Sequence, residues 1–164
     1  PQRVIDADEH ATASLTERLN AARRVQAAGY RLGFHFDPMI EYPGWETDYH
    51  AMLEESFATI DWRKLSWVSL GVLRDTPGLK RIMRERFPRS QLLTGEQVLC
   101  ADGKLRYYQP LRIQMYRQMV SWIRRAAPTV KVYLCMESRE VWEQVFGYAP
   151  SCEKELGNQM APAI

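Results

Sequence analysis

Two side chains that can bind a ligand or carry a proton, His35 and Asp37, lie close together in a segment that alternates between apolar and polar residues. Leu32, Phe34 and Phe36 fall on one face of a strand with period two, and His35 and Asp37 fall on the other. The proline that follows Asp37 cannot donate a ladder hydrogen bond, which predicts that the strand ends there with a carboxylate at its C-terminal tip. Ligands of α/β sheets and barrels bind at that end. An aspartate at this position equally suits a turn or a helix cap, so both interpretations stay open.

Two later segments repeat this division into an apolar and a polar face. The predicted strand 65–70 carries Ser69 on its polar face, and the predicted strand 131–136 leads into Glu137 on its polar face. The C-terminal ends of parallel strands meet at one edge of a sheet. We therefore expect Asp37, Ser69 and Glu137 to surround one mouth.

The elements that position these strands have the spacing of amphipathic helices. The predicted helices cover residues 15–28, 45–60, 77–87, 110–126 and 138–146. Strands that alternate with helices predict an α/β fold with a mainly parallel sheet. Strands with one apolar and one polar face fit a barrel better than a sheet covered by helices on both sides. Three β-α units do not close a barrel, so the pattern predicts half of one.

The two ends of the chain lack such a period. Residues 1–13 predict a solvated loop. Four of its side chains could also contribute to a metal site: Asp6, Asp8, Glu9 and His10. Residues 149–164 contain Pro, Gly and Asn without periodicity, which predicts a poorly ordered tail after a structural unit over residues 1–148.

A β-hairpin is predicted at about residues 91–108, where the alternation of strands and helices breaks. The pair Asp102-Gly103 is a strong hairpin signal and favours a type I′ turn. Basic and aromatic side chains follow this turn: Lys104, Arg106, Tyr107, Tyr108 and, in the next helix, Arg112. Cations hold phosphates and aromatic rings stack on bases, so these residues predict a nucleic-acid contact. A structural hairpin beside a solvated basic helix would have the same pattern, and this alternative also stays open.

Positive charge is concentrated around this hairpin. From Lys80 to Arg125 there are 11 Lys and Arg residues against 3 Asp and Glu residues, whereas the whole chain has a formal net charge of +2. Such a concentration favours a surface that meets a polyanion. Because neighbouring strand residues point to opposite faces, Tyr108 rather than Tyr107 shares the face of Arg106.

The composition is that of an ordinary globular domain, with 164 residues of which 46% are hydrophobic and 26% charged. No apolar run approaches the roughly 20 residues that span a bilayer, and the N-terminal residues do not resemble a secretory signal, so we expect a cytoplasmic protein without a membrane partner. The spacing of Cys100, Cys135 and Cys152 predicts neither a disulfide framework nor a zinc site.

A set of short motifs is distributed over residues 1–147. The motifs are Ala21–Val25, Gly29–Pro38, Gly44–Glu46 with Tyr49, Trp67–Gly71, Arg84–Pro88, Tyr133–Ser138, Val141–Trp142 and Phe146–Gly147. Together they resemble the C-terminal half of the spore photoproduct lyase family. The resemblance implies the C-terminal half of a partial (β/α)6 TIM-like barrel with an inserted β-hairpin. It also implies a radical enzyme, in which a 4Fe-4S cluster cleaves S-adenosylmethionine and the radical reverses a UV-induced thymine dimer in DNA.

The resemblance assigns roles to the candidate residues. The family places the adenosyl part of S-adenosylmethionine across the strand ends, so His35, Asp37 and Ser69 are expected to line the cofactor pocket. UV-damaged DNA is expected to contact the hairpin, with Arg106 and Tyr107 at the lesion and the other basic residues on phosphates.

One motif of the family is missing. The cluster-binding sequence Cys-x3-Cys-x2-Cys does not occur, so no residue of this chain is assigned to a metal or to catalysis. We therefore expect the C-terminal portion of a longer radical enzyme, inactive alone, whose partner is the missing N-terminal half of the barrel. The alternative is a non-catalytic half-barrel module that binds nucleic acid or a partner protein. The three-cysteine motif, if present in frame upstream of Pro1, would select the enzyme.

Overall fold

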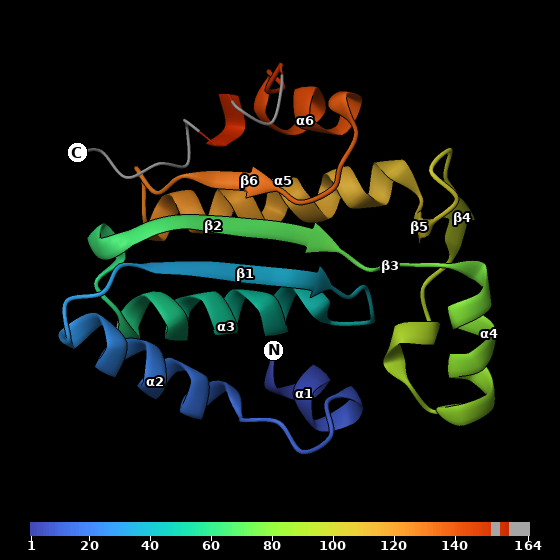
Figure 1. Ribbon diagram of the computed structural model, residues 1–164, viewed down its shortest axis with the longest axis horizontal. Helices are drawn as coiled ribbons and strands as arrows, with labels where there is room; N and C mark the ends of the chain where they lie inside the picture. The colour runs from blue at the N-terminus through green and yellow to red at the C-terminus, as the bar shows by residue number, and fades with distance from the viewer. Residues whose placement is uncertain (152–154, 158–164) are drawn as a thin grey trace.

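A parallel sheet forms the centre of the molecule in the computed structural model, which describes residues 1–151 and 155–157. Its strands are β1 (Leu32–Met39), β2 (Leu65–Val72) and β6 (Val132–Leu134), in the order β1-β2-β6. Both pairings are parallel, as Figure 1 shows. The predicted α/β fold with a parallel sheet is therefore confirmed.

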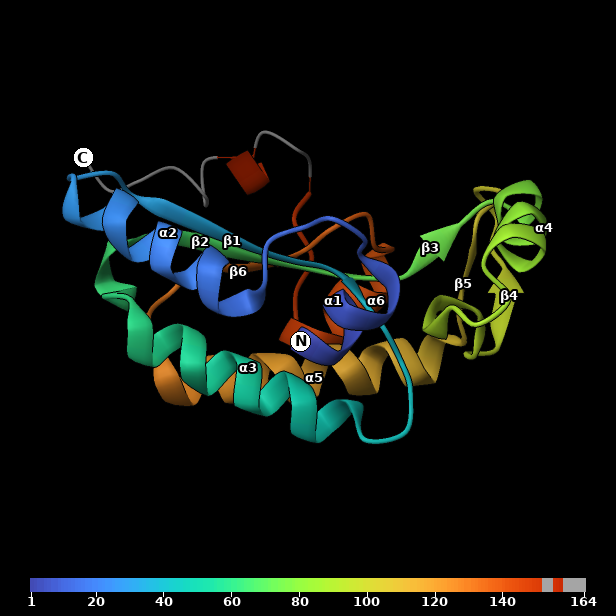
Figure 2. The ribbon, with the colours of Figure 1, turned by 90° about the horizontal axis from the view of Figure 1, so that it is seen from below.

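Helices α3 (Trp45–Thr59) and α5 (Gln109–Ala126) form a layer on one face of this sheet (Figure 2). Helix α2 (Leu15–Ala27) precedes β1 and packs on α3, and α6 (Arg139–Phe146) packs on α5. These four helices agree with the predicted ones to within two residues at each end. A 3-10 turn at Trp62–Lys64, which the sequence analysis did not include, leads into β2.

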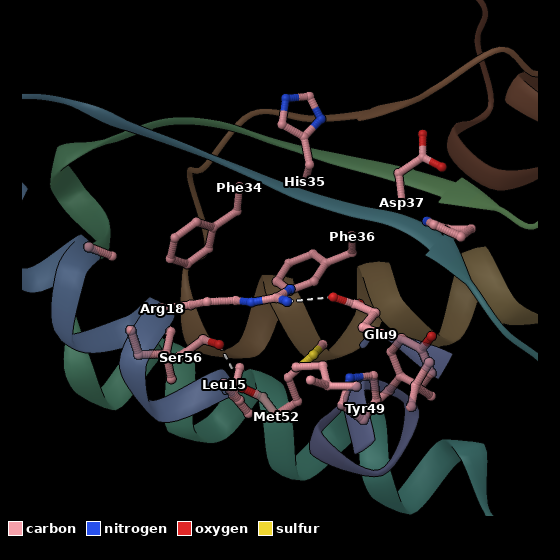
Figure 3. A pocket seen from close by; sticks show the side chains of 16 residues that line it. Glu9, Leu15, Arg18, Phe34, His35, Phe36, Asp37, Tyr49, Met52 and Ser56 are labelled. Carbon is pink, nitrogen blue, oxygen red and sulfur yellow. Dashed lines mark hydrogen bonds and ion pairs between the residues drawn. The ribbon is translucent and has the colours of Figure 1, made fainter. Parts of the chain in front are cut away.

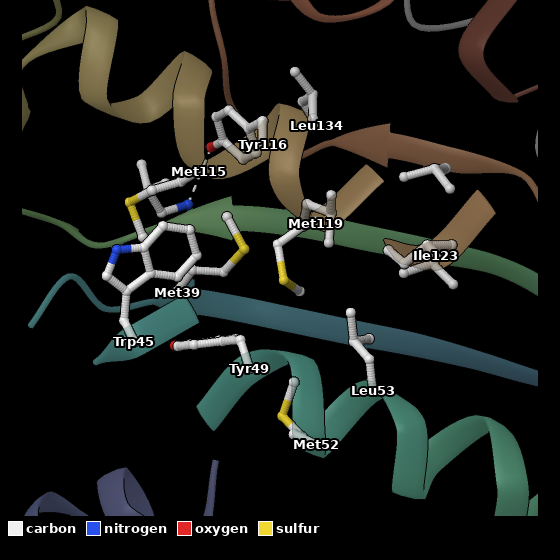
Figure 4. Packing of buried hydrophobic residues seen from close by; sticks show 14 of the residues in the cluster. Met39, Trp45, Tyr49, Met52, Leu53, Met115, Tyr116, Met119, Ile123 and Leu134 are labelled. Atoms are coloured by element: carbon white, nitrogen blue, oxygen red, sulfur yellow. Dashed lines mark hydrogen bonds between the residues drawn. The ribbon is translucent and has the colours of Figure 1, made fainter. Parts of the chain in front are cut away.

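The core lies between the sheet and the layer of α3 and α5. Figure 4 shows Met39 of β1, Tyr49 and Leu53 of α3, and Met115 and Met119 of α5 in one cluster. Each of these side chains is 2% exposed or less. Burying an apolar side chain of this size contributes about 1.5–3 kcal/mol, so this contact holds the two helices against the sheet.

Local signals set the ends of the helix before β1. Ser14 accepts a hydrogen bond from the Glu17 backbone N–H, and the Glu17 carboxylate accepts from the Ser14 backbone N–H, which is a capping box. Gly29, with a φ of 93°, turns the chain toward β1. Both features confirm the predicted helix.

A second, smaller sheet lies beyond the C-terminal end of β2. It has the order β3-β5-β4, with strands β3 (Arg74–Asp75), β5 (Leu105–Tyr107) and β4 (Gln97–Leu99). Helix α4 (Pro77–Arg86) and a 3-10 turn at Gln91–Leu93 accompany it (Figure 1). The hairpin of β4 and β5 is confirmed, and β3 was not predicted.

The turn of the hairpin differs from the predicted type I′ turn. Gly103 has a φ of 77°, but Asp102 does not have a positive φ, so only one of the two central positions fits. The loop is longer and is closed by the Cys100 N–H, which donates to the Lys104 carbonyl at 2.8 Å.

The prediction of a loop at residues 1–13 is wrong for its first part, which forms helix α1 (Gln2–Asp8). Val4 and Ile5 are buried, and the Gln2 side chain accepts from the first N–H of α2 at 2.7 Å. Tertiary contacts thus stabilise a helix too short to show a period. No group of three acidic, His or Cys side chains that could hold a metal occurs in the described residues.

Two strand ends also differ from the prediction. β1 continues through Pro38 to Met39. Among the described residues it pairs only with β2, and the register shifts between Phe36 and Met39, so no ladder bond from Pro38 is needed. β6 ends at Leu134 instead of residue 136, since the chain turns at Met136 with a φ of 53°.

The predicted poorly ordered tail lies partly outside the described residues, at 152–154 and 158–164. Of its described part, Ala149 and Leu156 pack against the core cluster. No helix of the described residues is long and apolar enough to cross a membrane.

Candidate functional site

The face of the main sheet opposite α3 and α5 carries the polar residues, and we call it the polar face. It is made by His35, Asp37, Trp67, Ser69, Tyr133 and Cys135. Figure 3 shows His35 and Asp37 pointing away from the helices while Phe34 and Phe36 point toward them. The predicted alternation of β1 is thus confirmed.

A row of rings crosses the polar face. The Trp67 ring lies 4.6 Å from the His35 ring and 5.8 Å from the Tyr133 ring, both in edge contacts. Trp67 can lie across β1 because Gly33 has no side chain; a Cβ there would be 2.4 Å from the indole. His35 remains exposed. The row of rings therefore forms an aromatic surface on the face of the sheet opposite α3 and α5.

Ser69 lies in the middle of this face, in register with His35 on one side and Tyr133 on the other. The residue is fully buried, yet its Oγ has no hydrogen-bond partner among the described residues. An unpaired buried hydroxyl costs about 1–3 kcal/mol relative to a paired one. Ser69 Oγ is thus an unpaired group that a polar ligand could satisfy only by displacing the side chains that cover it.

Asp37 ends the polar face with an ion pair. Arg74 Nη1 and Nη2 donate to its two carboxylate oxygens at 2.9 and 3.0 Å, and the two side chains are less than one fifth exposed. The hydrogen bond to Asp37 raises the pKa of Arg74. Cys135 Sγ lies 3.8 Å from Arg74 Nη2, and burial, followed by a hydrogen bond to Asp37, raises the pKa of the Cys135 thiol. The thiol is therefore protonated at neutral pH.

Glu137 does not join Asp37 and Ser69, so this part of the predicted mouth is wrong. Its carboxylate accepts hydrogen bonds from Arg112 Nε at 3.1 Å and from the Tyr116 hydroxyl at 2.9 Å, both on α5. The turn at Met136 breaks the alternation, so Glu137 points to the core side of the sheet. The Arg112 side chain is also buried in this pair, so a phosphate contact of Arg112 stays a prediction that would require the pair to open.

The two hairpin residues predicted to contact the DNA lesion, Arg106 and Tyr107, are also buried within the protein. Arg106 is 6% exposed and forms two hydrogen bonds with Asp102, at 2.7 and 2.8 Å. Tyr107 is fully buried, and burial raises its pKa to about 12. The Tyr107 ring packs against Gly95 and its hydroxyl accepts from the Glu41 N–H, and Arg106 also donates to the Met136 carbonyl. Because both side chains are buried, their contact with DNA stays a prediction that would require them to be uncovered.

Two of the candidate residues in the predicted hairpin remain accessible. Tyr108, the alternative aromatic residue, is 63% exposed at the start of α5. Lys104 is half-buried beside the hairpin turn. Arg106 fixes the hairpin turn, because its bonds to Asp102 join the return strand to the loop. The same bonds lower the pKa of the Asp102 carboxyl.

A pocket of about 260 Å³ lies beside β1, and the sequence analysis missed it because it depends on α1. Phe34 and Phe36 form one wall, Leu15 and Met52 of α2 and α3 the other (Figure 3). An ion pair between Arg18 and Glu9 crosses it. Among the described residues β1 is an edge strand of the main sheet, so the pocket flanks a free backbone edge.

Comparison with known proteins identifies the family. A family model described as Spore photoproduct lyase matches residues 1–132. The chain belongs to the spore photoproduct lyase family. Spore photoproduct lyase of Geobacillus sp. (strain Y412MC61) is 31% identical over 137 residues, covering 79% of this chain and 40% of that protein. The Bacillus subtilis (strain 168) enzyme is 33% identical over 96 residues, covering 57% of this chain and 28% of the relative.

Solved structures of spore photoproduct lyase match the fold. One complexed with dinucleoside spore photoproduct has a TM-score of 0.70 and 28% sequence identity, over 82% of this chain and 42% of that chain. A mutant with bound AdoMet and dinucleoside spore photoproduct gives the same values. The matched segments thus span between 28% and 42% of the length of these relatives and solved structures.

The described residues do not fit the iron-sulfur cluster that the family resemblance implies. A 4Fe-4S cluster requires cysteine thiolates held close together. Cys100 lies in the hairpin loop and Cys135 follows β6, and no grouping of three potential ligands occurs in the described part of the chain. The polar face offers groups of another kind, the exposed His35 ring and the buried, unpartnered Ser69 hydroxyl.

Proposed function

We propose that the chain is the C-terminal portion of a radical spore photoproduct lyase that repairs UV-induced thymine dimers in DNA, built on the C-terminal half of a partial (β/α)6 barrel. The observation that carries this proposal is the polar face of the parallel sheet, in a chain of the spore photoproduct lyase family. In a barrel, this face would line the interior, and the C-terminal tips with Asp37 and Arg74 would form part of the mouth.

His35, Ser69 and Asp37 would contact the adenosyl part of S-adenosylmethionine. When bound and cleaved by a reduced cluster, this cofactor supplies the radical chemistry of the enzyme. Ser69 Oγ gains the hydrogen bond that it lacks, and the exposed His35 ring can bond the same ligand. Arg74 occupies one lone pair on each oxygen of Asp37, which leaves acceptor sites for a ribose hydroxyl.

The cluster would be held by an N-terminal half that supplies the three cysteines. The 164 residues alone would then be inactive, and their role is to shape the cofactor and substrate sites. Pairing with that half would also use the free edge of β1. A non-catalytic half-barrel that binds nucleic acid or a protein is the second candidate, favoured by the absence of a metal-binding group from the described residues.

The test is an assay of the full-length gene product, purified without oxygen and reconstituted with iron and sulfide. With S-adenosylmethionine and a chemical reductant, it should convert dinucleoside spore photoproduct into two separate thymidine nucleosides, since the bond that breaks is the one that joins the two bases. Ser69→Ala should weaken cofactor binding, measured by equilibrium dialysis. If the open reading frame lacks the three-cysteine motif and the product turns over no substrate, the half-barrel module is the correct function.

Tyr108 and Lys104 would contact the damaged DNA, while Arg106 and Tyr107 shape the hairpin that presents them. Tyr108→Ala in the full-length protein should lower affinity for lesion-bearing DNA by about 1–3 kcal/mol, because base stacking on an aromatic ring is worth that much. Fluorescence anisotropy measures the affinity. Tyr30→Ala is the matched control, since Tyr30 is 67% exposed and precedes β1 at the opposite end of the molecule. Equal affinity of both variants would remove Tyr108 from the interface.

A further inference from the structure

Helix α4 and the residues that follow it form a cationic surface at the end of the molecule that carries the smaller sheet (Figures 1 and 2). Arg84, Arg86 and Arg89 are exposed, and none of them has a charged or hydrogen-bonded partner in the described structure. We call these three arginines together with Phe87 the α4 surface. Glu85, the acidic residue among them, is paired with Arg81 at 2.8 Å. The charge of the three arginines is therefore uncompensated.

Most other arginines of the basic stretch 80–125 are paired within the protein, whereas Arg125 is exposed at the C-terminal end of α5. Arg106 and Arg112 are neutralised by Asp102 and Glu137. Arg117 and Arg124 donate to backbone carbonyls near the ends of their elements. The excess of basic residues seen in the sequence thus becomes a free positive field mainly where α4 ends, and not along the hairpin strand that the sequence pointed to.

Apolar side chains accompany these arginines. Phe87 is 51% exposed, and Leu79 and Ile82 of α4 are 48% and 40% exposed. Phe87 and Arg89 also line a cleft against α1. Guanidinium groups beside an exposed ring suit a partner that combines phosphates with flat apolar sugar and base edges.

The position of α4 relates this surface to the hairpin. Lys80 Nζ donates to Gln97 Oε1 of β4 at 2.6 Å, so α4 is fixed to the sheet that carries Tyr108 at the end of β5. Both lie beyond the C-terminal ends of β1 and β2 (Figure 2). A long polyanion that contacts the α4 surface can therefore extend toward Tyr108.

We propose that the α4 surface binds the phosphate backbone of duplex DNA that flanks the lesion. The inference rests on the proposed function, because it takes the partner to be the DNA that carries the photoproduct. Three unpaired guanidinium groups give sequence-independent contacts that position the duplex, whereas the hairpin and the polar face act on the damaged bases.

The test compares two triple variants of the full-length protein. Arg84→Gln, Arg86→Gln and Arg89→Gln remove the charge, and glutamine keeps a good helix former at the two positions that lie in α4. The matched control is Arg23→Gln, Arg24→Gln and Lys64→Gln, three exposed cations at the opposite end of the molecule. Binding of a short undamaged duplex is measured by anisotropy over a range of salt concentrations, so that the result does not depend on turnover.

The α4 variant should bind the duplex roughly tenfold more weakly, and the slope of log affinity against log salt should fall by about 0.9 for each lost phosphate contact. The control should bind like the wild type. Turnover of free dinucleoside spore photoproduct, which has no flanking duplex, should be unchanged in both variants. A protein that binds the duplex through α4 but turns over no photoproduct would disprove the proposed function and not this surface.

Three results would overturn the inference. One is an unchanged affinity and salt slope in the α4 variant. Another is an equal loss in the control variant, which would indicate a general effect of net charge. The third is unchanged duplex binding with lost binding to vesicles of phosphatidylserine and phosphatidylcholine, which would assign the α4 surface to a membrane.

Discussion

Replacing Arg112 by methionine is expected to lower the free energy of unfolding by about 3–5 kcal/mol, because it leaves the Glu137 carboxylate buried without its cation. Arg112 donates to both oxygens of Glu137, at 3.1 and 3.4 Å, and the two side chains are 7% and 2% exposed. Tyr116 donates to the same carboxylate at 2.9 Å but brings no charge. The substitution also removes a bond of 2.7 Å to the Tyr107 carbonyl, which joins α5 to the smaller sheet.

Urea denaturation of the purified protein measures this loss. The double variant Arg112→Met and Glu137→Leu should be more stable than Arg112→Met alone, since an apolar pair of similar volume carries no desolvation cost. It also keeps the prediction testable if the single variant does not fold. Arg117→Met is the matched control, because Arg117 lies on the same helix but is exposed. A cost for Arg112→Met no larger than for this control would show that the ion pair does not stabilise the fold.

The position of Asp37 could be predicted from sequence because its cause is local. A strand alternates its side chains whatever surrounds it, so Leu32 to Asp37 already separated an apolar from a polar face. The spacing of α3 and α5 then identified the layer that covers the apolar face. Ser69 follows from the same rule on β2. These residues occupy the expected face because nothing interrupts the strand between them.

Glu137 was misplaced because its direction depends on a turn that alternation does not describe. β6 ends at Leu134, and Met136 takes a φ of 53° that is uncommon for a residue with a side chain. The prediction continued the alternation of side chains past Leu134 and therefore placed Glu137 on the wrong face of the sheet. A buried partner, Arg112, confirms the side that it takes.

The burial of Arg106 and Tyr107 depends on contacts between distant parts of the chain. β3 has only two residues, which show no period, yet its pairing with β5 makes the return strand of the hairpin a central strand. Tyr107 then reaches across to accept from the Glu41 N–H at 3.1 Å. Helix α1 was missed for a similar reason, since its seven residues fall below the window in which a helical period can be read.

Substituting Gly71 by alanine is expected to lower the free energy of unfolding by about 1–3 kcal/mol, the usual cost of overpacking a filled site. A Cβ at Gly71 would lie 2.6 Å from both Cγ and Oδ2 of Asp37. The carboxylate cannot move aside freely, because Arg74 donates to it at 2.9 and 3.0 Å. The methyl group must therefore displace Asp37 from Arg74 or move β1 away from β2.

A double-mutant cycle isolates this contact. In an Asp37→Ala background the atoms that the methyl group meets are gone, so Gly71→Ala should cost clearly less there than in the wild type. Gly78→Ala serves as the control, because a Cβ at Gly78 meets nothing within 4 Å, and it should leave stability unchanged or slightly raised. Equal costs of Gly71→Ala in the two backgrounds would show that the strain arises elsewhere.

The same substitution should also loosen the smaller sheet. Arg74 belongs to β3, where it pairs with Arg106 of β5, while its side chain bonds Asp37 at the tip of β1. Releasing Asp37 therefore removes a bidentate bond that ties the hairpin to the main sheet. Amide hydrogen exchange in β4 and β5 should accelerate in Gly71→Ala and stay unchanged in Gly78→Ala. Because Asp37 also borders the proposed cofactor site, this ion pair would couple the position of the hairpin to the polar face, and unaltered exchange in the hairpin would rule that coupling out.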